Sequence, residues 1–191
     1  MKASDSMAQG KKPRAVFVVG PTGVGKTDIS VSLACHLNAE IISADSMQVY
    51  RYMDIGTAKP SAAQRRKRRH HLLDVVDPDG EFNVALFRDY ALVAMEEIWA
   101  RGRNVLVVGG TGLYVKALVR GLFRGVGRNV ELRASLERTI SEKGLGFLFE
   151  RLKRADPNAG ERIHPHDRIR IVRALEVLDG TGKPLSEWHQ E

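Results

Sequence analysis

The sequence predicts an α/β protein with a P-loop, parallel-sheet core, helices on both faces of the sheet, and a small all-helical insertion. Over residues 15–122, short apolar segments typical of buried strands alternate with segments of helical periodicity. A glycine-rich segment joins the first strand segment to the first helical segment. From about residue 123 onward, the apolar positions follow helical spacing only. We therefore expect one parallel sheet with a helical part beside it.

The elements of the first part follow from apolar runs and from residues that begin or end helices. Residues 15–19 are all apolar and end at Gly20, as expected for a buried parallel strand. Asn83 is a suitable N-cap for a long helix, and Gly102 follows its expected end. In chain order, we expect a strand at 15–19, a helix at about 27–37, a strand at 40–43, a helix at about 84–101, a strand at 105–108 and a helix at about 112–119.

The second part shows apolar stripes at helical spacing. One stripe runs through Leu132, Leu136 and Ile140, and another runs from Leu145 to Leu152. Asp167 can cap a last helix, which extends through Leu178. In that helix, two arginines, Arg170 and Arg173, face away from an apolar stripe formed by Ile171, Val172, Leu175 and Leu178.

These patterns divide the chain into four parts. The predicted organisation is a flexible N-terminal tail at 1–14, the P-loop α/β core at 15–122, a helical insertion subdomain at 123–165, and a helix at 166–191 that returns to the core. With 191 residues, 43% of them hydrophobic, the chain can form a core without disulfides or metals.

Composition excludes several classes of protein. The single cysteine, Cys35, rules out an intramolecular disulfide framework and is expected in the core among its apolar neighbours. No apolar run approaches the roughly 18 residues of a spanning helix, so no membrane association is expected. The first fourteen residues lack the apolar region of a secretory signal. We expect a monomeric cytoplasmic enzyme.

The strongest chemical signal is the segment Gly20-Pro21-Thr22-Gly23-Val24-Gly25-Lys26-Thr27, which fits the phosphate-loop pattern G-x-x-x-x-G-K-[ST]. Its glycines let backbone N–H groups surround phosphate oxygens, and the following helix start adds a favourable dipole. Lys26 supplies a positive charge, and Thr27 can ligate Mg²⁺. The motif predicts that residues 20–27 bind a di- or triphosphate, with Mg²⁺ as cofactor; by motif alone, ATP would also fit.

The position of the nearest carboxylate limits the chemistry. In many P-loop enzymes a second apolar strand ends in an acid that holds Mg²⁺, but the strand at 105–108 ends in Gly109-Gly110-Thr111. Asp45 stands instead at the carboxyl end of the strand at 40–43, where ligands of open α/β sheets bind. Asp45 could ligate Mg²⁺, take a proton from a substrate, or close a turn with Ser46.

A basic segment carries most of the net charge of +7. Between Asp54 and Asp74 there is no acid, whereas the segment contains Lys59, Arg65, Arg66, Lys67, Arg68 and Arg69. It is either a solvated, mobile loop or a surface that contacts nucleic-acid phosphates with strong salt dependence. Because no aromatic residues are interleaved, it is not typical of a base-stacking platform.

Several sequence blocks together resemble the tRNA dimethylallyltransferase family. In chain order they are Gly20–Thr27, Ile41–Tyr50, Met53–Pro60, His71–Asp74, Val108–Tyr114, Arg162–Pro165 and Arg173–Val177. The blocks occur in the family's order across residues 15–188, and their combination is specific although each block alone is not. Such enzymes move the dimethylallyl group of dimethylallyl diphosphate to N6 of the adenosine 3′-adjacent to the anticodon in tRNA, releasing diphosphate.

The resemblance implies roles for particular residues. Residues 20–27 would hold the diphosphate, Asp45 would be the general base on the adenine amino group, and Thr111 would lie near the reacting centre. It also implies tRNA contacts at Asp45, Ser46, Met47, Gln48, Arg133, Ile169, Arg170, Ile171, Val172 and Arg173. The implied partners are tRNA and dimethylallyl diphosphate.

Three departures from the family pattern bear on this expectation. The basic run Arg65–Arg69 replaces a less charged stretch, residues 124–129 lack a proline-rich opening, and the chain stops at Glu191, short of the family's usual end. We therefore expect this 191-residue form to be weakly active or inactive. The alternatives are a P-loop nucleotide or small-molecule kinase, an adenylate isopentenyltransferase acting on free nucleotides, and a tRNA-binding fragment without catalysis.

Overall fold

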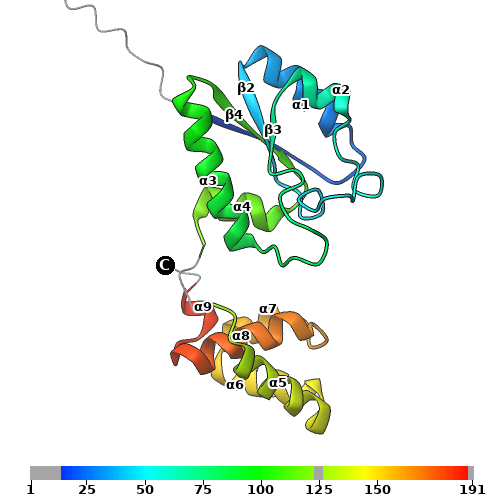
Figure 1. Ribbon diagram of the computed structural model, residues 1–191. Coiled ribbons are helices and arrows are strands. Elements are labelled where there is room, and N and C mark those ends of the chain that lie inside the picture. Colours follow the sequence, from blue (N-terminus) through cyan, green and yellow to red (C-terminus); the bar gives the residue numbers. More distant parts are fainter. Residues whose placement is uncertain (1–13, 123–126, 189–191) are drawn as a thin grey trace, which may run out of the picture. The chain divides into compact units, whose positions relative to one another are not determined.

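The computed structural model describes residues 14–122 and 127–188, and the chain divides into two units, Met1–Leu122 and Phe123–Glu191 (Figure 1). Residues 1–13 of the expected tail, and residues 124–126 of the segment at 124–129 that lacks a proline-rich opening, lie outside the described residues. In the first unit, one parallel sheet has the order β1-β4-β2-β3, formed by β1 (Ala15–Val19), β2 (Ala39–Ser43), β3 (His70–His71) and β4 (Asn104–Gly109). The predicted α/β class is confirmed.

Helices cover both faces of this sheet because its central strands are apolar on both sides. Successive side chains of a strand point to opposite faces, so Ile41 packs with α1 (Lys26–His36), whereas Ile42 packs with α3 (Val84–Ala100) and α4 (Gly112–Arg120). Both isoleucines are almost completely buried. The helix expected after Asn83 forms as predicted, and the Asn83 side chain accepts the backbone N–H groups of Ala85 and Leu86.

The carboxyl ends of β2 and β4 come unusually close together. Ser43 pairs with Val108, and the backbone N–H of Ala44 donates to the Val108 carbonyl over 2.7 Å. A Cβ atom at Gly109 would lie 2.1 Å from the Ala44 carbonyl oxygen, so only glycine fits there. The loops that leave these two strands therefore start side by side at one edge of the sheet.

Two elements of the first unit were not predicted from the sequence. The basic segment contains a short helix, α2 (Ala62–Lys67), and is followed by the two-residue strand β3, which pairs with β2. A capping box begins α2: Gln64 N–H donates to the Ser61 hydroxyl, and Ser61 N–H donates to the Gln64 side chain. The interpretation of this segment as a mobile loop is therefore wrong for residues 62–67. The spacing of Ser61 and Gln64, which fits a capping box, was the sequence pattern that could have indicated this helix.

The second unit is built from helices around its own apolar core. The described helices are α5 (Val130–Lys143), α6 (Leu145–Ala155), α7 (Pro157–Arg162), α8 (Arg168–Thr181) and α9 (Leu185–Trp188). The Asp167 side chain caps α8, as predicted, by accepting the Arg170 N–H. Ile171 and Leu175 of α8 are fully buried against residues of α5 and α6. The expected return of 166–191 to the α/β core is thus corrected, because the apolar stripe of α8 belongs to the core of the helical unit.

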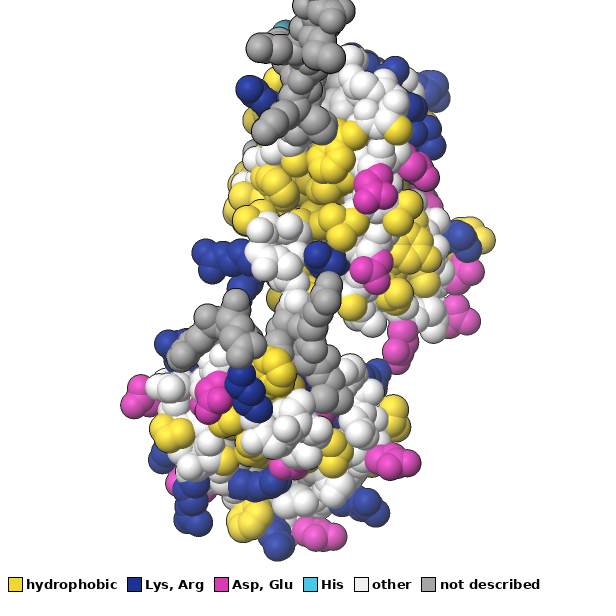
Figure 2. Space-filling view, turned by 90° about the vertical axis from the view of Figure 1, so that its left-hand side faces the viewer, with side chains coloured by type: hydrophobic (Ala, Val, Ile, Leu, Met, Phe, Trp, Pro, Cys, Tyr) yellow, Lys and Arg dark blue, Asp and Glu magenta, His cyan; other side chains and the backbone are white. Residues whose placement is uncertain are grey.

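One surface of the first unit exposes many apolar side chains, over α3 and α4 (Figure 2). The large exposed ones are Leu86, Tyr90 and Val93 on α3, and Leu113 and Val119 on α4. A contiguous exposed apolar area is uncommon on a surface that faces only water. In the part of the chain that the structure describes, no helix has both the length and the apolar character to cross a membrane.

Candidate functional site

The glycine-rich loop between β1 and α1 has the backbone that a phosphate loop needs. Gly23 and Gly25 have φ values of 88° and 80°, a left-handed conformation that favours glycine, and Gly25 is the N-cap of α1. Lys26 and Thr27 therefore occupy the first turn of the helix. The Lys26 ammonium reaches back across the loop and donates to the Pro21 carbonyl over 2.6 Å.

This loop forms one wall of a cavity of about 370 Å³. From the loop, Thr22, Gly23, Gly25, Lys26 and Thr27 line the cavity, whereas Gly20, Pro21 and Val24 do not. Ser43, Asp45 and Gln48 line it from β2 and the following turn, and the segment 57–60 with Gln64 and His70 contributes another wall. The cavity thus brings the predicted phosphate loop and Asp45 together.

Asp45 both closes a turn and faces the cavity. Its Oδ1 accepts the backbone N–H groups of Met47 at 2.9 Å and Gln48 at 3.3 Å. Its Oδ2 forms no hydrogen bond with any described residue, and the side chain is half-buried. The turn alternative from the sequence is therefore observed for one carboxylate oxygen, and the other oxygen is available to act as a base or as a metal ligand.

Thr111 supports this turn and lines neither of the two cavities that Asp45 lines. Its Oγ1 accepts the backbone N–H of Ser46 over 3.0 Å, and its own N–H donates to the Ala44 carbonyl over 3.2 Å. The contact crosses from the loop after β4 to the loop after β2. Thr111 thus holds the segment on either side of Asp45, so its geometry indicates a positioning residue.

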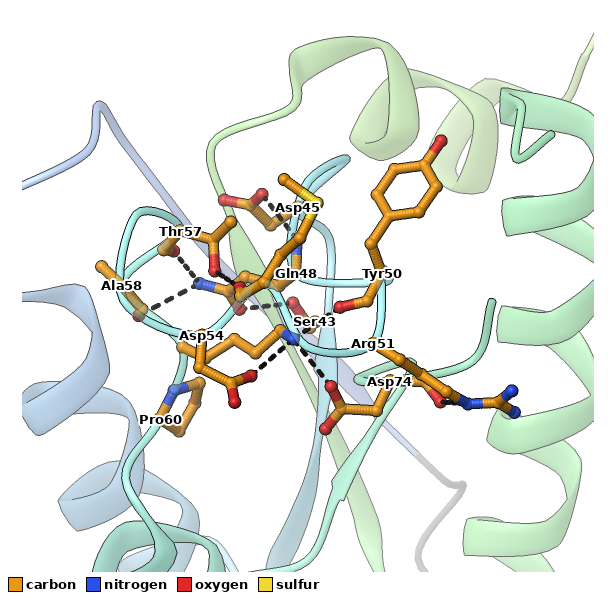
Figure 3. Close-up of polar contacts among 12 residues, drawn as sticks. Ser43, Asp45, Gln48, Tyr50, Arg51, Asp54, Thr57, Ala58, Pro60 and Asp74 are labelled. Atoms are coloured by element: carbon orange, nitrogen blue, oxygen red, sulfur yellow. Dashed lines mark hydrogen bonds and ion pairs between the residues drawn. The ribbon is translucent and has the colours of Figure 1, made fainter. Parts of the chain in front are cut away.

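Gln48 fixes the next part of the loop (Figure 3). Its Oε1 accepts the Ser43 hydroxyl at 3.0 Å, and its Nε2 donates to the carbonyls of Thr57 at 3.0 Å and Ala58 at 3.3 Å. These contacts use the side-chain amide at both of its ends. Gln48, expected to contact tRNA, therefore also holds the cavity wall at 57–58 against the end of β2.

A buried lysine, Lys59, was not recognised from the sequence as a structural residue; its acidic partners Asp54 and Asp74 are drawn in Figure 3. The Lys59 side chain is 1% exposed, and its ammonium donates to the Tyr50 carbonyl at 2.5 Å, Asp54 at 2.8 Å and Asp74 at 2.7 Å. Burial opposes its charge, but the two carboxylates outweigh burial and raise the pKa of Lys59. Asp54 and Asp74 lie 5 and 15 residues from Lys59 in the sequence, so no local pattern indicated this pairing.

The backbone around this lysine is held in an unfavourable conformation. Ala58 and Asp74 have φ values of 49° and 57°, a left-handed region that costs a non-glycine residue about 1 kcal/mol or more. The Gln48 amide fixes the Ala58 carbonyl, and the Asp74 carboxylate binds both Lys59 and Arg65. The loop conformation is therefore imposed by these side-chain contacts.

His70 and His71 face different surroundings. His71 Nε2 lies 2.7 Å from Glu40 Oε2, a buried carboxylate that also accepts two hydrogen bonds from Arg101. Burial alone would raise the pKa of Glu40, but Arg101 and His71 hold it below its usual value. His71 therefore stabilises the sheet edge, whereas His70 lines the cavity.

A second cavity, of about 500 Å³, also has Asp45 in its lining. It is lined by Thr22, Asp45, Met47, Tyr52, Met53, Asp54, Ile55, Gly56 and Thr57. Thr22, Asp45 and Thr57 line both cavities. Tyr52 and Ile55 are 82% and 98% exposed. Asp45 thus lines both a cavity with a phosphate loop and a cavity with apolar and aromatic side chains.

The expected tRNA strip on α8 divides into exposed and buried residues. Ile169 is 80% exposed and Arg170 is also exposed. Ile171 and Val172 are 0% and 4% exposed and pack in the helical core. The apolar periodicity predicts that these two side chains are buried, whereas the resemblance implies that they contact tRNA. The structure shows them buried, as the periodicity predicts.

Arg133 and Arg173 share one buried carboxylate, which sequence reasoning missed. Glu176 is fully buried and accepts hydrogen bonds from Arg133 at 2.9 and 3.0 Å, from Arg173 at 2.8 Å and from the Asn129 N–H at 2.7 Å. Burial would raise its pKa, but these donors lower the pKa of Glu176 to about 2. The spacing of Arg173 and Glu176 on one helix was the available signal.

The first cavity suits a metal ion that is bound mainly through a phosphorylated ligand and has few protein ligands. Among the described residues, no group of three or more His, Cys, Asp or Glu side chains could hold a metal ion. Mg²⁺ needs no such cage, since it commonly takes one or two protein oxygens together with phosphate and water. The Thr27 hydroxyl and the Asp45 carboxylate line the same cavity and are ligands of the right kind.

The fold and this cavity define a P-loop α/β protein of the class that handles phosphorylated ligands. The family described as IPP transferase matches residues 48–191. The chain is 48% identical to tRNA dimethylallyltransferase 2 of Geotalea uraniireducens over 94% of its own length, and 48% identical to the tRNA dimethylallyltransferase of Thermotoga maritima over 93%. The chain belongs to the IPP transferase family, whose curated relatives are tRNA dimethylallyltransferases.

Solved structures agree with this assignment. The full-length tRNA isopentenylpyrophosphate transferase of Bacillus halodurans matches 91% of this chain with 47% identity and a TM-score of 0.59, over 57% of its own length. A eukaryotic dimethylallyltransferase acting on tRNA matches 93% of this chain with 33% identity and a TM-score of 0.75, over 44% of its own length. The chain spans 58% of the length of the two curated relatives.

Proposed function

We propose that this chain carries the diphosphate-binding and proton-abstracting part of a tRNA dimethylallyltransferase. The reaction moves the dimethylallyl group of dimethylallyl diphosphate to N6 of the adenosine 3′-adjacent to the anticodon, and releases diphosphate. The observation that carries this proposal is that Asp45 lines two cavities, one with Lys26 and Thr27 and the other with apolar and aromatic side chains.

The first cavity suits the diphosphate of the donor. When the allylic C–O bond breaks, new negative charge appears on the diphosphate oxygens. The backbone N–H groups of the glycine loop, the start of α1 and the Lys26 ammonium are placed to stabilise that charge, most strongly in the transition state. Bound Mg²⁺, for which Thr27 is the proposed ligand, would supply further charge neutralisation there.

The second cavity suits the adenine. Met47 and Tyr52 offer apolar and aromatic surface to a base, and Asp45 lies at the shared wall. As N6 bonds to the allylic carbon and the C–O bond breaks, the amino group must lose a proton, which Asp45 Oδ2 accepts. The hydrogen bonds to Asp45 Oδ1 and the Thr111–Ser46 contact keep this carboxylate in place.

The helical unit provides side chains for the tRNA. We propose contacts from Ile169 and Arg170, which are exposed, and from Arg133 and Arg173, whose side chains remain about one third exposed beside Glu176. We propose no contact from the side chains of Ile171 and Val172, because they are buried.

A transfer assay with several acceptors tests the proposal. The protein, in excess over substrate, is incubated with Mg²⁺, dimethylallyl diphosphate labelled in the allyl group, and either tRNA or AMP; a parallel reaction contains ATP labelled at the γ-phosphate. We expect label in tRNA only. Label in AMP would assign the site to a free-nucleotide isopentenyltransferase, and phosphate transfer from ATP would assign it to a kinase.

A further inference from the structure

The cations of the basic segment Arg65–Arg69 fall into two groups, and the first group is tied to the fold. Arg65 donates to the Pro60 carbonyl at 2.9 Å and to Asp74 at 2.7 Å. Arg68 donates to the Sγ of Cys35 at 3.2 Å and to the Cys35 carbonyl at 3.3 Å, and Cys35 is exposed rather than buried in the core as expected. These two arginines serve the structure of the α/β unit.

The second group consists of Arg66, Lys67 and Arg69, which we call the basic rim. All three side chains are exposed, and none makes a hydrogen bond or ion pair with a residue in 14–122 or 127–188. No acid occurs between Asp54 and Asp74, and both of these carboxylates already bind Lys59. The basic rim is therefore a local concentration of positive charge without an ion-pair partner in that part of the chain.

The backbone that carries the basic rim is fixed. The capping box begins α2, the Gln64 amide donates to Asp28 of α1 at 2.7 Å, and the Arg69 carbonyl accepts the Ile41 N–H at 2.9 Å. Gln64 and His70, which flank the basic rim in the sequence, line the first cavity. The basic rim thus borders the proposed diphosphate site. Its backbone is already ordered, so binding a ligand would not have to order it.

We propose that the basic rim binds the phosphate backbone of the tRNA, adding to the binding surface of the proposed transferase a contact that does not depend on base sequence. The proposal rests on tRNA being the substrate. Point charges without aromatic partners fit phosphates better than bases, and each contact releases a condensed counterion. Cations in the last turn of α2 also interact favourably with the helix dipole. The competing explanation is that the basic rim only stabilises this helix and does not contact tRNA.

The test measures binding of unmodified tRNA at a series of KCl concentrations. The variant Arg66→Gln/Lys67→Gln/Arg69→Gln should bind more weakly at low salt, and its plot of log affinity against log salt should be flatter by about two to three units, since each contact contributes about 0.7 to 0.9. The matched control Arg66→Lys/Arg69→Lys keeps the charges and should keep the slope of the original protein.

Binding of pyrophosphate with Mg²⁺ is measured in the same proteins and should not change. If the triple variant loses it, the single variants Arg66→Gln and Lys67→Gln replace it, and each should flatten the slope by about 0.7 to 0.9. An unchanged slope, or no salt-dependent tRNA binding by the original protein, overturns the inference. Salt-dependent tRNA binding by an original protein that does not bind pyrophosphate with Mg²⁺ would instead contradict the proposed function, but not the inference about the basic rim.

Discussion

The Thr111 hydroxyl accepts the backbone N–H of Ser46 over 3.0 Å and so joins two loops that are 65 residues apart in the sequence. Ser46 directly follows Asp45, whose carboxylate closes the same turn. A side chain outside both cavities thus fixes the residue proposed to move the proton. We therefore expect Thr111 to position Asp45 and not to touch the reacting atoms itself.

Replacing Thr111 by valine should lower the transfer rate by about tenfold, because the loss of one hydrogen bond costs about 1 to 1.5 kcal/mol in holding the turn. Thr111→Ser keeps the hydroxyl and should restore most of the rate. The affinity for dimethylallyl diphosphate should stay within twofold in both variants. Single-turnover transfer and equilibrium binding check these results, and a serine variant as slow as the valine variant would contradict the positioning role.

Lys59 should contribute substantially to stability. In Lys59→Met the carboxylates of Asp54 and Asp74 and the Tyr50 carbonyl lose a buried donor, so we expect a loss of about 2 to 3 kcal/mol in the free energy of unfolding. The matched control is Lys67→Met, which removes an exposed and unpaired ammonium and should change stability by less than about 0.5 kcal/mol. Urea denaturation of both variants measures these losses. Equal losses in the free energy of unfolding would contradict the structural role of Lys59.

Glu176 should make the helical unit sensitive to acid. Its pKa is lowered from 4.5 to about 2 in the folded protein, so its stabilisation is complete above pH 4.5 and is lost as the pH falls toward 2. Glu176→Gln should cost about 3 kcal/mol near neutral pH, because two guanidinium groups lose a buried partner. The difference between the two proteins should shrink between pH 4.5 and 2.

The control for this prediction is Glu137→Gln, which breaks an exposed pair with Arg168. Exposed pairs contribute at most about 1 kcal/mol, so this variant should unfold nearly as the original protein does. Denaturation followed at pH 3 and pH 6 measures both variants. A small Glu176→Gln effect would show that the cluster is dispensable, and a large effect that does not change with pH would contradict the lowered pKa of Glu176.

Thr27 should affect the metal requirement. Thr27→Ala removes the proposed hydroxyl ligand and should raise the Mg²⁺ concentration needed for diphosphate binding, whereas Thr27→Ser should behave like the original protein. Calorimetric titration with pyrophosphate at several Mg²⁺ concentrations measures the shift. The same Mg²⁺ dependence in the alanine variant and the original protein would remove Thr27 from the metal site.

The sequence was sufficient for elements that local patterns determine. The strand at 15–19, the Asn83 and Asp167 caps and the glycine loop all depend on neighbouring residues, and all are present. The expected burial of this strand was wrong, because β1 lies at the edge of the sheet and is half-buried with exposed ends. The burial of Ile171 also followed from the helical stripe. Periodicity and capping therefore predict most helices and strands of both units, but not α2, β3 or the place of α8 in the helical unit.

The walls of the site could not be predicted in the same way. In the sequence, nothing distinguishes Lys59 from the other cations of its segment. Only the fold brings Asp54, Asp74 and the Tyr50 carbonyl around it. The amide of Gln48 gives no local sign that it binds backbone carbonyls at 57 and 58. These contacts join loop residues whose conformations no periodic pattern determines.

The pairing of diphosphate binding with proton abstraction is tested most directly by Asp45→Asn. The amide oxygen can still accept the N–H groups of Met47 and Gln48, so the turn should persist, but the side chain can no longer take a proton. Single-turnover transfer to tRNA and the affinity for dimethylallyl diphosphate with Mg²⁺ are measured on the same protein. We predict a rate lower by about 10² to 10⁴ with the affinity nearly unchanged; a fall of rate and affinity in proportion would make Asp45 mainly a metal ligand and contradict its role as the base.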